Sequence, residues 1–291
     1  MCMRCYRYMK FDRAEQSLKT QFFKVSRPSD FNDPFECRGR IVNVEVPLRK
    51  YVHENLERLR NEAIVKSMAA GTIRAEEQSV FTEEILFQQY VETTKRVIDD
   101  ESLRVADTLL LMMCLVLEKG LKPDSDVLFW SHYADAGQGV RVTFDLPKKS
   151  RAHYMCPVDY SKELPIFDAA EMDGWLKGEK FKSFIERLTH TKGEAWKYEH
   201  EIRMIIPRHL PYALPDGKKH VRQIIVKGRP LEFIRVDPSV IRRVDFGPRV
   251  DKAKAEKLVC DLRKSSEYSH VHFFETMFDD AKYAYQYKRV A

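Results

Sequence analysis

The sequence has 291 residues, of which 44% are hydrophobic and 32% are charged, and its formal net charge is +6. This composition is typical of globular proteins, and the length suffices for one large domain or two modest ones. The longest apolar candidate, 106–117, is interrupted by Asp107 and Thr108, which argues against a membrane-spanning helix. The positive charges are spread along the whole chain, so they permit a nucleic-acid partner without requiring one.

The first residues and the cysteines indicate a cytoplasmic protein. Residues 1–4 are not followed by an apolar stretch, so no secretory signal is predicted. The six cysteines are scattered, which is typical of reduced thiols. Cys2 and Cys5 form a C-x-x-C pair, but a zinc site would need two further ligands, and only isolated candidates such as Cys37 are present. No metal site is therefore predicted.

The N-terminal segment predicts a strand, a helix and a second strand. Residues 4–8 alternate as in a strand, 11–19 place apolar residues near one helical face, and 22–26 form a short apolar run. Asp12 is the expected cap of the helix.

The loop at 27–36 contains two prolines, which fix their own φ, and Asx side chains, which bond to nearby backbone N–H groups. We expect a tight turn held by Asn32 and Asp33 and packed by Phe31 and Phe35. Alternatively, Asn32 and Asp33 form the edge of a pocket.

The middle of the chain predicts helices followed by apolar elements. Residues 48–105 are nearly free of glycine and carry helical apolar stripes, so they are interpreted as a helical insert. Residues 108–117 are mostly apolar and fit either a buried strand or a buried helix. A new element begins at 127, a glycine-bearing turn follows at 134–139, and 140–145 alternate as a strand.

The C-terminal half predicts further strands and two helices. Strands are expected at 157–160, 221–227, 240–246 and 271–274, and helices at 181–192 and 251–264, with a loop at 214–217. The tail, 283–290, mixes tyrosines with basic residues. It fits a docked terminal segment, although such residues can also stack on nucleic-acid bases.

The stretch 196–207 joins two carboxylates to an apolar strand. Strand residues at i and i+2 point to the same side, so in a strand that begins near Tyr198 we expect Glu199, Glu201 and Arg203 to share one face. The opposite face is then apolar, with Ile202, Met204 and Ile206. This pattern fits either a site at the mouth of the strand or an outer face of solvated charges.

Three motifs together resemble an uncharacterised bacterial family, best described as a domain of unknown function. They are FNDPFE at 31–36, WSHYAD at 130–135 followed by Gly139, and WxYExExR at 196–203. Residues 224–228 also resemble the C-terminal half of that family. The resemblance spans nearly the whole chain outside the helical insert.

A second resemblance is to the ADP-ribosyltransferase superfamily. It rests on an arginine in the first strand, a helix and a second strand, a later aromatic segment, and a Glu-x-Glu that leads into an apolar strand. It implies a catalytic role for Glu201, and Glu199 would deprotonate an acceptor. It also implies that Arg7, or alternatively Arg4, grips NAD, and that further cofactor-binding residues are Tyr8, Asn32, Asp33, Trp130, Ser131, His132 and Tyr133. The superfamily often has the sequence Ser-Thr-Ser in its middle segment, which shapes the nicotinamide pocket. This chain departs from that pattern, because the corresponding residues are Trp-Ser-His-Tyr at 130–133 or, alternatively, Cys114.

The chemistry that this resemblance implies is physically consistent. Cleavage of the nicotinamide–ribose bond builds positive charge on the ribose, as glycoside cleavage does, and a carboxylate such as Glu201 stabilises that charge. A guanidinium such as Arg7 can hold a phosphate, and Trp130 or Tyr133 could stack on nicotinamide. The alternative is a purely structural role, in which Arg7 forms an ion pair with Glu201 or Glu36.

We therefore expect a single α+β domain over 1–291, with a twisted, mostly antiparallel split β core like that of an ADP-ribosyltransferase and the helical insert at 48–105. The expected function is NAD-dependent ADP-ribosyl transfer to a nucleic acid or a protein, with NAD as substrate. Such an enzyme fits a toxin or a phage-defence effector with a neutralising antitoxin partner, and no membrane partner is expected.

Two other classes of function remain open from the sequence. A metal-dependent nuclease could use clustered carboxylates together with His132; the acids are Asp33, Glu36, Glu199 and Glu201. A non-catalytic module that binds nucleic acid or protein is the other alternative.

Overall fold

The computed structural model describes residues 2–72, 79–148, 153–169, 178–208 and 221–290. The chain divides into two compact units. The sheet unit comprises 1–34, 107–160 and 192–291, and the helical unit comprises 35–106 and 161–191. The expected loop at 214–217 lies outside the described residues.

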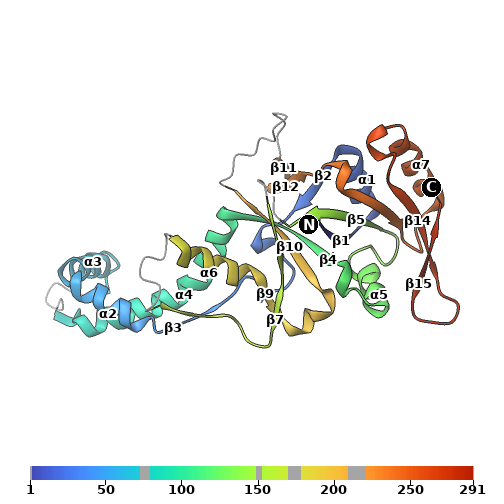
Figure 1. The fold of residues 1–291 in the computed structure, drawn as a ribbon. Helices are drawn as coiled ribbons and strands as arrows, with labels where there is room; N and C mark the ends of the chain where they lie inside the picture. The colour runs from blue at the N-terminus through green and yellow to red at the C-terminus, as the bar shows by residue number, and fades with distance from the viewer. Residues whose placement is uncertain (1, 73–78, 149–152, 170–177, 209–220, 291) are drawn as a thin grey trace. The chain divides into compact units, whose positions relative to one another are not determined.

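The sheet unit is built on an eight-stranded sheet with the order β15-β14-β13-β5-β1-β4-β10-β6. Neighbouring strands are antiparallel except β13 and β14, which are parallel, and the sheet curls into a half-barrel (Figure 1). The α+β class and the mostly antiparallel sheet are thus confirmed. The strands are β1 (Cys2–Met9), β4 (Leu110–Leu117), β5 (Val140–Pro147), β6 (Tyr154–Pro157), β10 (Glu201–Pro207), β13 (Ile241–Phe246), β14 (His272–Phe278) and β15 (Tyr285–Arg289).

One face of this sheet holds the main core. Ile202, Met204 and Ile206 of β10 are buried in it, as their alternation predicted. The segment 108–117, which fitted a strand or a helix, is a helix end followed by β4, and β4 pairs with β10 along its length.

Two helices cover the core face. In α1 (Phe11–Thr20), Ala14 and Leu18 are buried, and in α7 (Lys252–Arg263), Leu258 and Leu262 are buried in the same core. Asp251 caps α7, because its side chain accepts a hydrogen bond from the Lys254 N–H. The expected cap of α1 was wrong: Lys10 occupies the N-cap position, and Asp12 lies in the first turn, where an acid favours the helix dipole.

The other face of the sheet packs on α5 (Pro123–His132). Phe129 and Trp130 of this helix are buried beside Tyr8 of β1 and Val116 of β4. The turn after α5 returns the chain to β5, and Asp135 and Ala136 there have φ of 53°. Gly139 ends this turn, and a Cβ at that position would lie 2.2 Å from the Met9 carbonyl oxygen, so only glycine fits this close approach.

The smaller elements of the sheet unit include a three-stranded sheet in the order β11-β12-β2. Its strand β12 was not predicted, because Pro230 and the charged residues around it conceal the apolar alternation. The expected strand at 157–160 is instead two short strands. These elements are β2 (Phe22–Val25), β11 (Val221–Val226) and β12 (Arg229–Arg235), together with β7 (Asp159–Ser161) and β9 (Thr191–Gly193), each of which has one residue in the helical unit.

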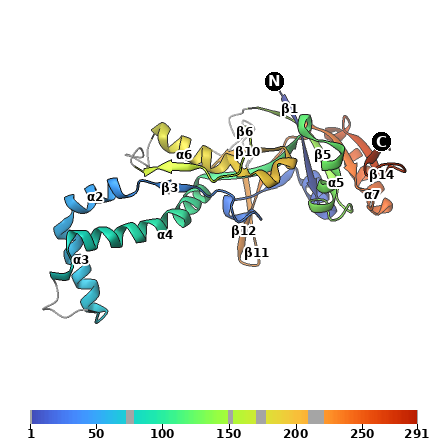
Figure 2. The same ribbon diagram turned by 90° about the horizontal axis from the view of Figure 1, so that it is seen from below.

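The helical unit contains its own core of apolar residues, which include Val52, Leu59 and Leu86. Helices fill most of the range 48–105, and the long helix α4 is plain in Figure 2. Phe35, expected to pack the 27–36 turn, is 64% exposed. The elements are β3 (Arg40–Val42), α2 (Glu45–Glu54), α3 (Leu56–Ala69), β8 (Ile166–Asp168), α6 (Gly178–His190) and α4 (Glu83–Leu109), whose last residues belong to the sheet unit.

Candidate functional site

A buried ion cluster lies at the beginning of β10. The Lys192 Nζ atom is 2.6 Å from Glu199 Oε2 and 2.9 Å from Glu201 Oε2. The three residues are 7%, 4% and 6% exposed, respectively. Two carboxylates withdrawn from water in this way require a cation between them, and Lys192 supplies it.

Arg203 extends the cluster along the strand. Its Nε donates to Glu201 Oε1 at 2.8 Å, and its side chain is 0% exposed. The Phe31 ring lies 5.2 Å from the guanidinium carbon. Burial lowers the pKa of Arg203 to about 9, and the carboxylate of Asp33, itself buried, opposes this effect. The guanidinium therefore remains charged at neutral pH.

Two tyrosines fix the acidic residues of the cluster. The Tyr133 hydroxyl donates to Glu199 Oε1, and the Glu201 backbone N–H donates to the Tyr160 hydroxyl oxygen at 2.7 Å. The cluster therefore joins residues from all three sequence motifs: Phe31 and Asp33 from the first, Tyr133 from the second, and the Glu-x-Glu and Arg203 from the third.

The backbone at His200 explains how both glutamates reach one ammonium. Glu199 ends a 3-10 helix (Glu194–Glu199), and His200 follows with φ of 43° and ψ of 46°. The strand begins only at Glu201, later than the predicted start near Tyr198. Glu201 and Arg203 share a strand face as predicted, whereas Glu199 reaches the cluster from the preceding turn.

The electrostatics of the cluster reflect competition between burial and ion pairing. Burial raises the pKa of Glu201, while Lys192 and the Cys114 thiol, which donates to its carboxylate, lower it. Burial alone would lower the pKa of Lys192, but Glu201 and Glu199 together raise it above its ordinary value. The Lys192 side chain is therefore a charged ammonium between the two carboxylates.

Arg7 is connected to this cluster through Cys114. It starts from the core face of β1, as Cys5 and Met9 do, and its Nη2 donates to the Lys24 carbonyl oxygen at 2.7 Å. Its Nη1 is shielded from solvent and has no hydrogen-bond partner among the described residues. Burial lowers the pKa of Arg7 to about 10, and Cys114 opposes that effect. Arg4, the alternative, instead pairs with Asp145 at 2.9 Å.

The other predicted cofactor-binding residues lie in different surroundings. Trp130 is 0% exposed and packs against Tyr8, whose ring also stacks on Phe129 at 5.0 Å. The protein therefore covers the Trp130 ring, which is not presented to a ligand here. Three residues are exposed on the surface, namely Asn32, Ser131 and His132.

Sequence reasoning missed Lys192 and Tyr160. Lys192 follows α6 and was assigned to the end of that helix, and Tyr160 was assigned to a short strand without a function. Neither residue belongs to a motif. Only the fold brings them to Glu201, so no local signal could have identified them.

The expected ligands of a nuclease metal do not form such a site here. Within the described residues, no three His, Cys, Asp or Glu side chains are arranged to hold a metal ion. His132 is exposed, and Glu199 and Glu201 are engaged by Lys192.

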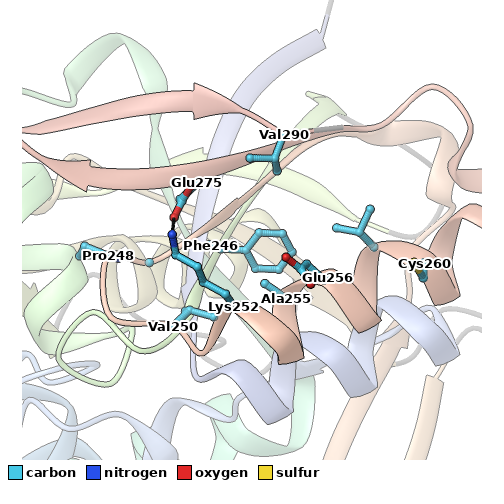
Figure 3. A pocket seen from close by; sticks show the side chains of 11 residues that line it. Phe246, Pro248, Val250, Lys252, Ala255, Glu256, Cys260, Glu275 and Val290 are labelled. Atoms are coloured by element: carbon cyan, nitrogen blue, oxygen red, sulfur yellow. Dashed lines mark ion pairs between the residues drawn. The ribbon is translucent and has the colours of Figure 1, made fainter.

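A separate pocket of about 320 Å³ lies between α7 and the β14–β15 hairpin (Figure 3). Its walls are mostly apolar, with Phe246 at the base and Val290 on the opposite side. Lys252 and Glu275 pair across it at 3.0 Å. Volumes of this order accommodate small ligands, but the pocket shares no lining residue with the cluster.

Comparison with known families finds a similarity in the middle of the chain. Residues 129–204 match the family model described as a protein of unknown function, DUF2971. The match includes two of the three motifs and most of the cluster: Tyr133, Tyr160, Lys192, Glu199, Glu201 and Arg203. The expected resemblance to a family of unknown function is thus confirmed for this span. No curated protein and no solved structure matches the chain. Within the described residues, no helix is long and apolar enough to cross a membrane.

Proposed function

We propose that the protein transfers the ADP-ribose group of NAD to a macromolecule, with Glu201 as the catalytic carboxylate. The observation that carries the proposal is the pair Glu199 and Glu201, held on one buried ammonium at the start of β10. Reactions at a glycosidic carbon use two carboxyl groups a few ångströms apart. Breaking the bond between nicotinamide and ribose belongs to this class.

The arrangement of charges supports a division of roles. Burial strengthens the field of a carboxylate on a neighbouring cation, and Lys192 and Arg203 form ion pairs with Glu201 in that environment. Glu201 would stabilise the positive ribose as the bonding electrons leave with nicotinamide. The acceptor nucleophile would then bond to the ribose carbon and release its proton to Glu199, which Tyr133 and Lys192 orient.

The residues near the cluster fit parts of NAD. Half-buried rings that could contact the nicotinamide ring are those of Tyr133, Tyr198 and Trp196, and Trp196 lies 4.8 Å from the Lys192 ammonium. The Nη1 of Arg7 has no hydrogen-bond partner among the described residues and would donate to a phosphate oxygen once the ligand displaces the atoms that shield it. We assign no stacking role to Trp130, because its ring is fully buried.

The likeness to the split ADP-ribosyltransferase core belongs to the same proposal. Strands β1 and β4 pair only at Cys5–Leu117 and Tyr6–Val116, and Arg7 follows at the point where this pairing ends. We propose that this separation corresponds to the split of that core. An enzyme that modified a host macromolecule would be toxic, so we retain the proposal of a toxin or phage-defence effector with a neutralising partner.

The test is nicotinamide release from NAD by the purified protein, with RNA, DNA or a protein extract as acceptor. We expect Glu201→Gln to lower release by about 10²–10³-fold and Glu199→Gln to impair transfer more than hydrolysis. Glu232→Gln is the matched control, because Glu232 is also buried and ion-paired, with Arg27 and Arg208, but shares no residue with the cluster.

Two results would contradict the proposal. One is no nicotinamide release with any of the three acceptors. The other is equal release by the Glu201→Gln and Glu232→Gln variants. Nucleic-acid cleavage that requires a divalent metal would favour the nuclease instead.

A further inference from the structure

The β13–β15 edge of the sheet carries two arginines and a histidine on one face. The register places Arg243 beside His272 and Phe274 beside Arg289. Because side chains at i and i+2 share a face, these residues from three adjacent strands lie together. We call these four residues the basic corner. His272 and Arg289 are exposed, and Arg243 is 28% exposed.

The charge of the basic corner is predominantly positive. Burial lowers the pKa of His272, and the other groups that lower it are all basic: Arg289, Arg263, His270 and Arg243. The Arg263 guanidinium donates to backbone carbonyl oxygens of 268, 269 and 271, so these contacts leave its positive charge in place. Asp245, which contacts Arg243 at 2.5 Å, is fully buried and also bound by Arg141.

Aromatic rings alternate with the cations on the same face. The Arg243 guanidinium lies 3.6 Å from the Phe274 ring centre and 4.9 Å from that of Tyr287. Arg141 then lies 4.3 Å from Tyr287 and 4.9 Å from Tyr6. This stacking holds the Arg243 plane fixed.

The same hairpin ends in exposed aromatic residues. Phe278 shares the face of Phe274, is 56% exposed, and lies 5.8 Å from the Tyr285 ring. Tyr283, in the connecting turn, is 96% exposed. Phe278 lies six positions after His272 in β14, a span of about 20 Å along a strand. Figure 1 shows the hairpin at the edge of the sheet, beside α5.

We propose that this surface binds single-stranded nucleic acid, with phosphates at the basic corner and bases on the rings of Phe278 and Tyr283. Recognition of single-stranded nucleic acid has two components: positive side chains placed along the phosphate backbone, and exposed aromatic rings that stack on the bases. The exposed rings favour a nucleic acid over an acidic protein, because a polyacidic peptide has no flat rings to stack. The surface is independent of the chemistry at Glu201.

The test is fluorescence anisotropy with labelled U20 RNA and dT20 DNA at several salt concentrations. We expect Arg243→Gln with Arg289→Gln to weaken binding and to reduce the slope of log affinity against log salt by about 0.7 for each phosphate that is no longer neutralised. Phe278→Ala with Tyr283→Ala should weaken binding by about fivefold or more per ring and leave the slope unchanged. Glu201→Gln should bind as the unchanged protein does, which separates this proposal from the proposed function.

The matched control is Arg222→Gln with Arg229→Gln on β11 and β12, which removes two exposed positive charges elsewhere. Equal weakening by this pair and by the basic-corner pair would overturn the proposal. Absence of binding at low salt, or tighter binding to polyglutamate or to anionic lipid vesicles than to either oligonucleotide, would also overturn it. Circular dichroism of every variant verifies that the fold is retained.

Discussion

At the scale of single residues, the buried cluster depends on Lys192. Its ammonium is the common partner of Glu199 and Glu201, and Arg203 also contacts Glu201. The sequence placed Glu201 and Arg203 on one face correctly, because strand alternation is a local property. It missed Lys192, since a lysine after a helix is ordinarily solvated.

We predict that Lys192→Met destabilises the fold by about 3–5 kcal/mol at pH 7, because it leaves buried carboxylates without their cation. Without Lys192, burial raises the pKa of Glu201 further. A carboxyl group whose pKa is raised by folding favours the folded state when it is protonated. In the variant, this stabilisation by Glu201 is fully present below the pKa of an unfolded glutamate, about 4.3, and it is lost as pH rises through the pKa of Glu201 in the folded protein. The deficit should therefore shrink between pH 7 and pH 5.

Urea denaturation of the variant and the unchanged protein at both pH values measures this difference. Lys252→Met is the control, because its ion pair with Glu275 is 80% exposed on the lysine side and should contribute little. A deficit that is the same at pH 5 and pH 7 would show that Glu201 is not left ionised and buried.

At the scale of elements, the turn at His200 determines the site. It separates a 3-10 helix from β10 and directs Glu199 and Glu201 toward the same side. The sequence predicted the strand but placed its start too early. A glycine in the sequence often indicates a left-handed backbone conformation, but a histidine does not. The left-handed conformation of His200 is therefore imposed by the packing around it.

We predict that His200→Val destabilises the protein by about 1–2 kcal/mol more than His200→Gly, because a β-branched residue is poorly tolerated at positive φ. Glycine adopts this conformation without steric cost. Chemical denaturation of the two variants gives the difference directly. Equal stabilities would mean that the left-handed conformation at 200 is not maintained in solution.

At the scale of the whole molecule, the protection of backbone amides against hydrogen exchange should differ between the two sheets of the sheet unit. β5 is paired on both sides, with β1 and β13, and most of its side chains are buried. β11 is an edge strand of the three-stranded sheet, with Ile225 66% exposed. Amides in doubly paired, buried strands open only with the global fold, whereas edges open locally.

We therefore predict that hydrogen exchange followed by mass spectrometry finds the slowest amides in 140–146 and much faster exchange in 221–226. The comparison is internal, since both segments are measured in one sample. Comparable protection of the two segments would contradict this order of stability.

The sequence by itself determined the α+β class, most of the strands and helices, and the apolar face of β10, because periodicity reports which side of an element is buried. It also predicted a resemblance to a family of unknown function, and two of the three motifs lie in the span that matches DUF2971. Only the tertiary structure decided which side chains meet: it brought Lys192 and Tyr160 to the glutamates, buried Trp130, and assembled the basic corner from β13, β14 and β15. The physical reason is that pairing between strands distant in the chain fixes these contacts, and register and burial arise only when the sheet forms.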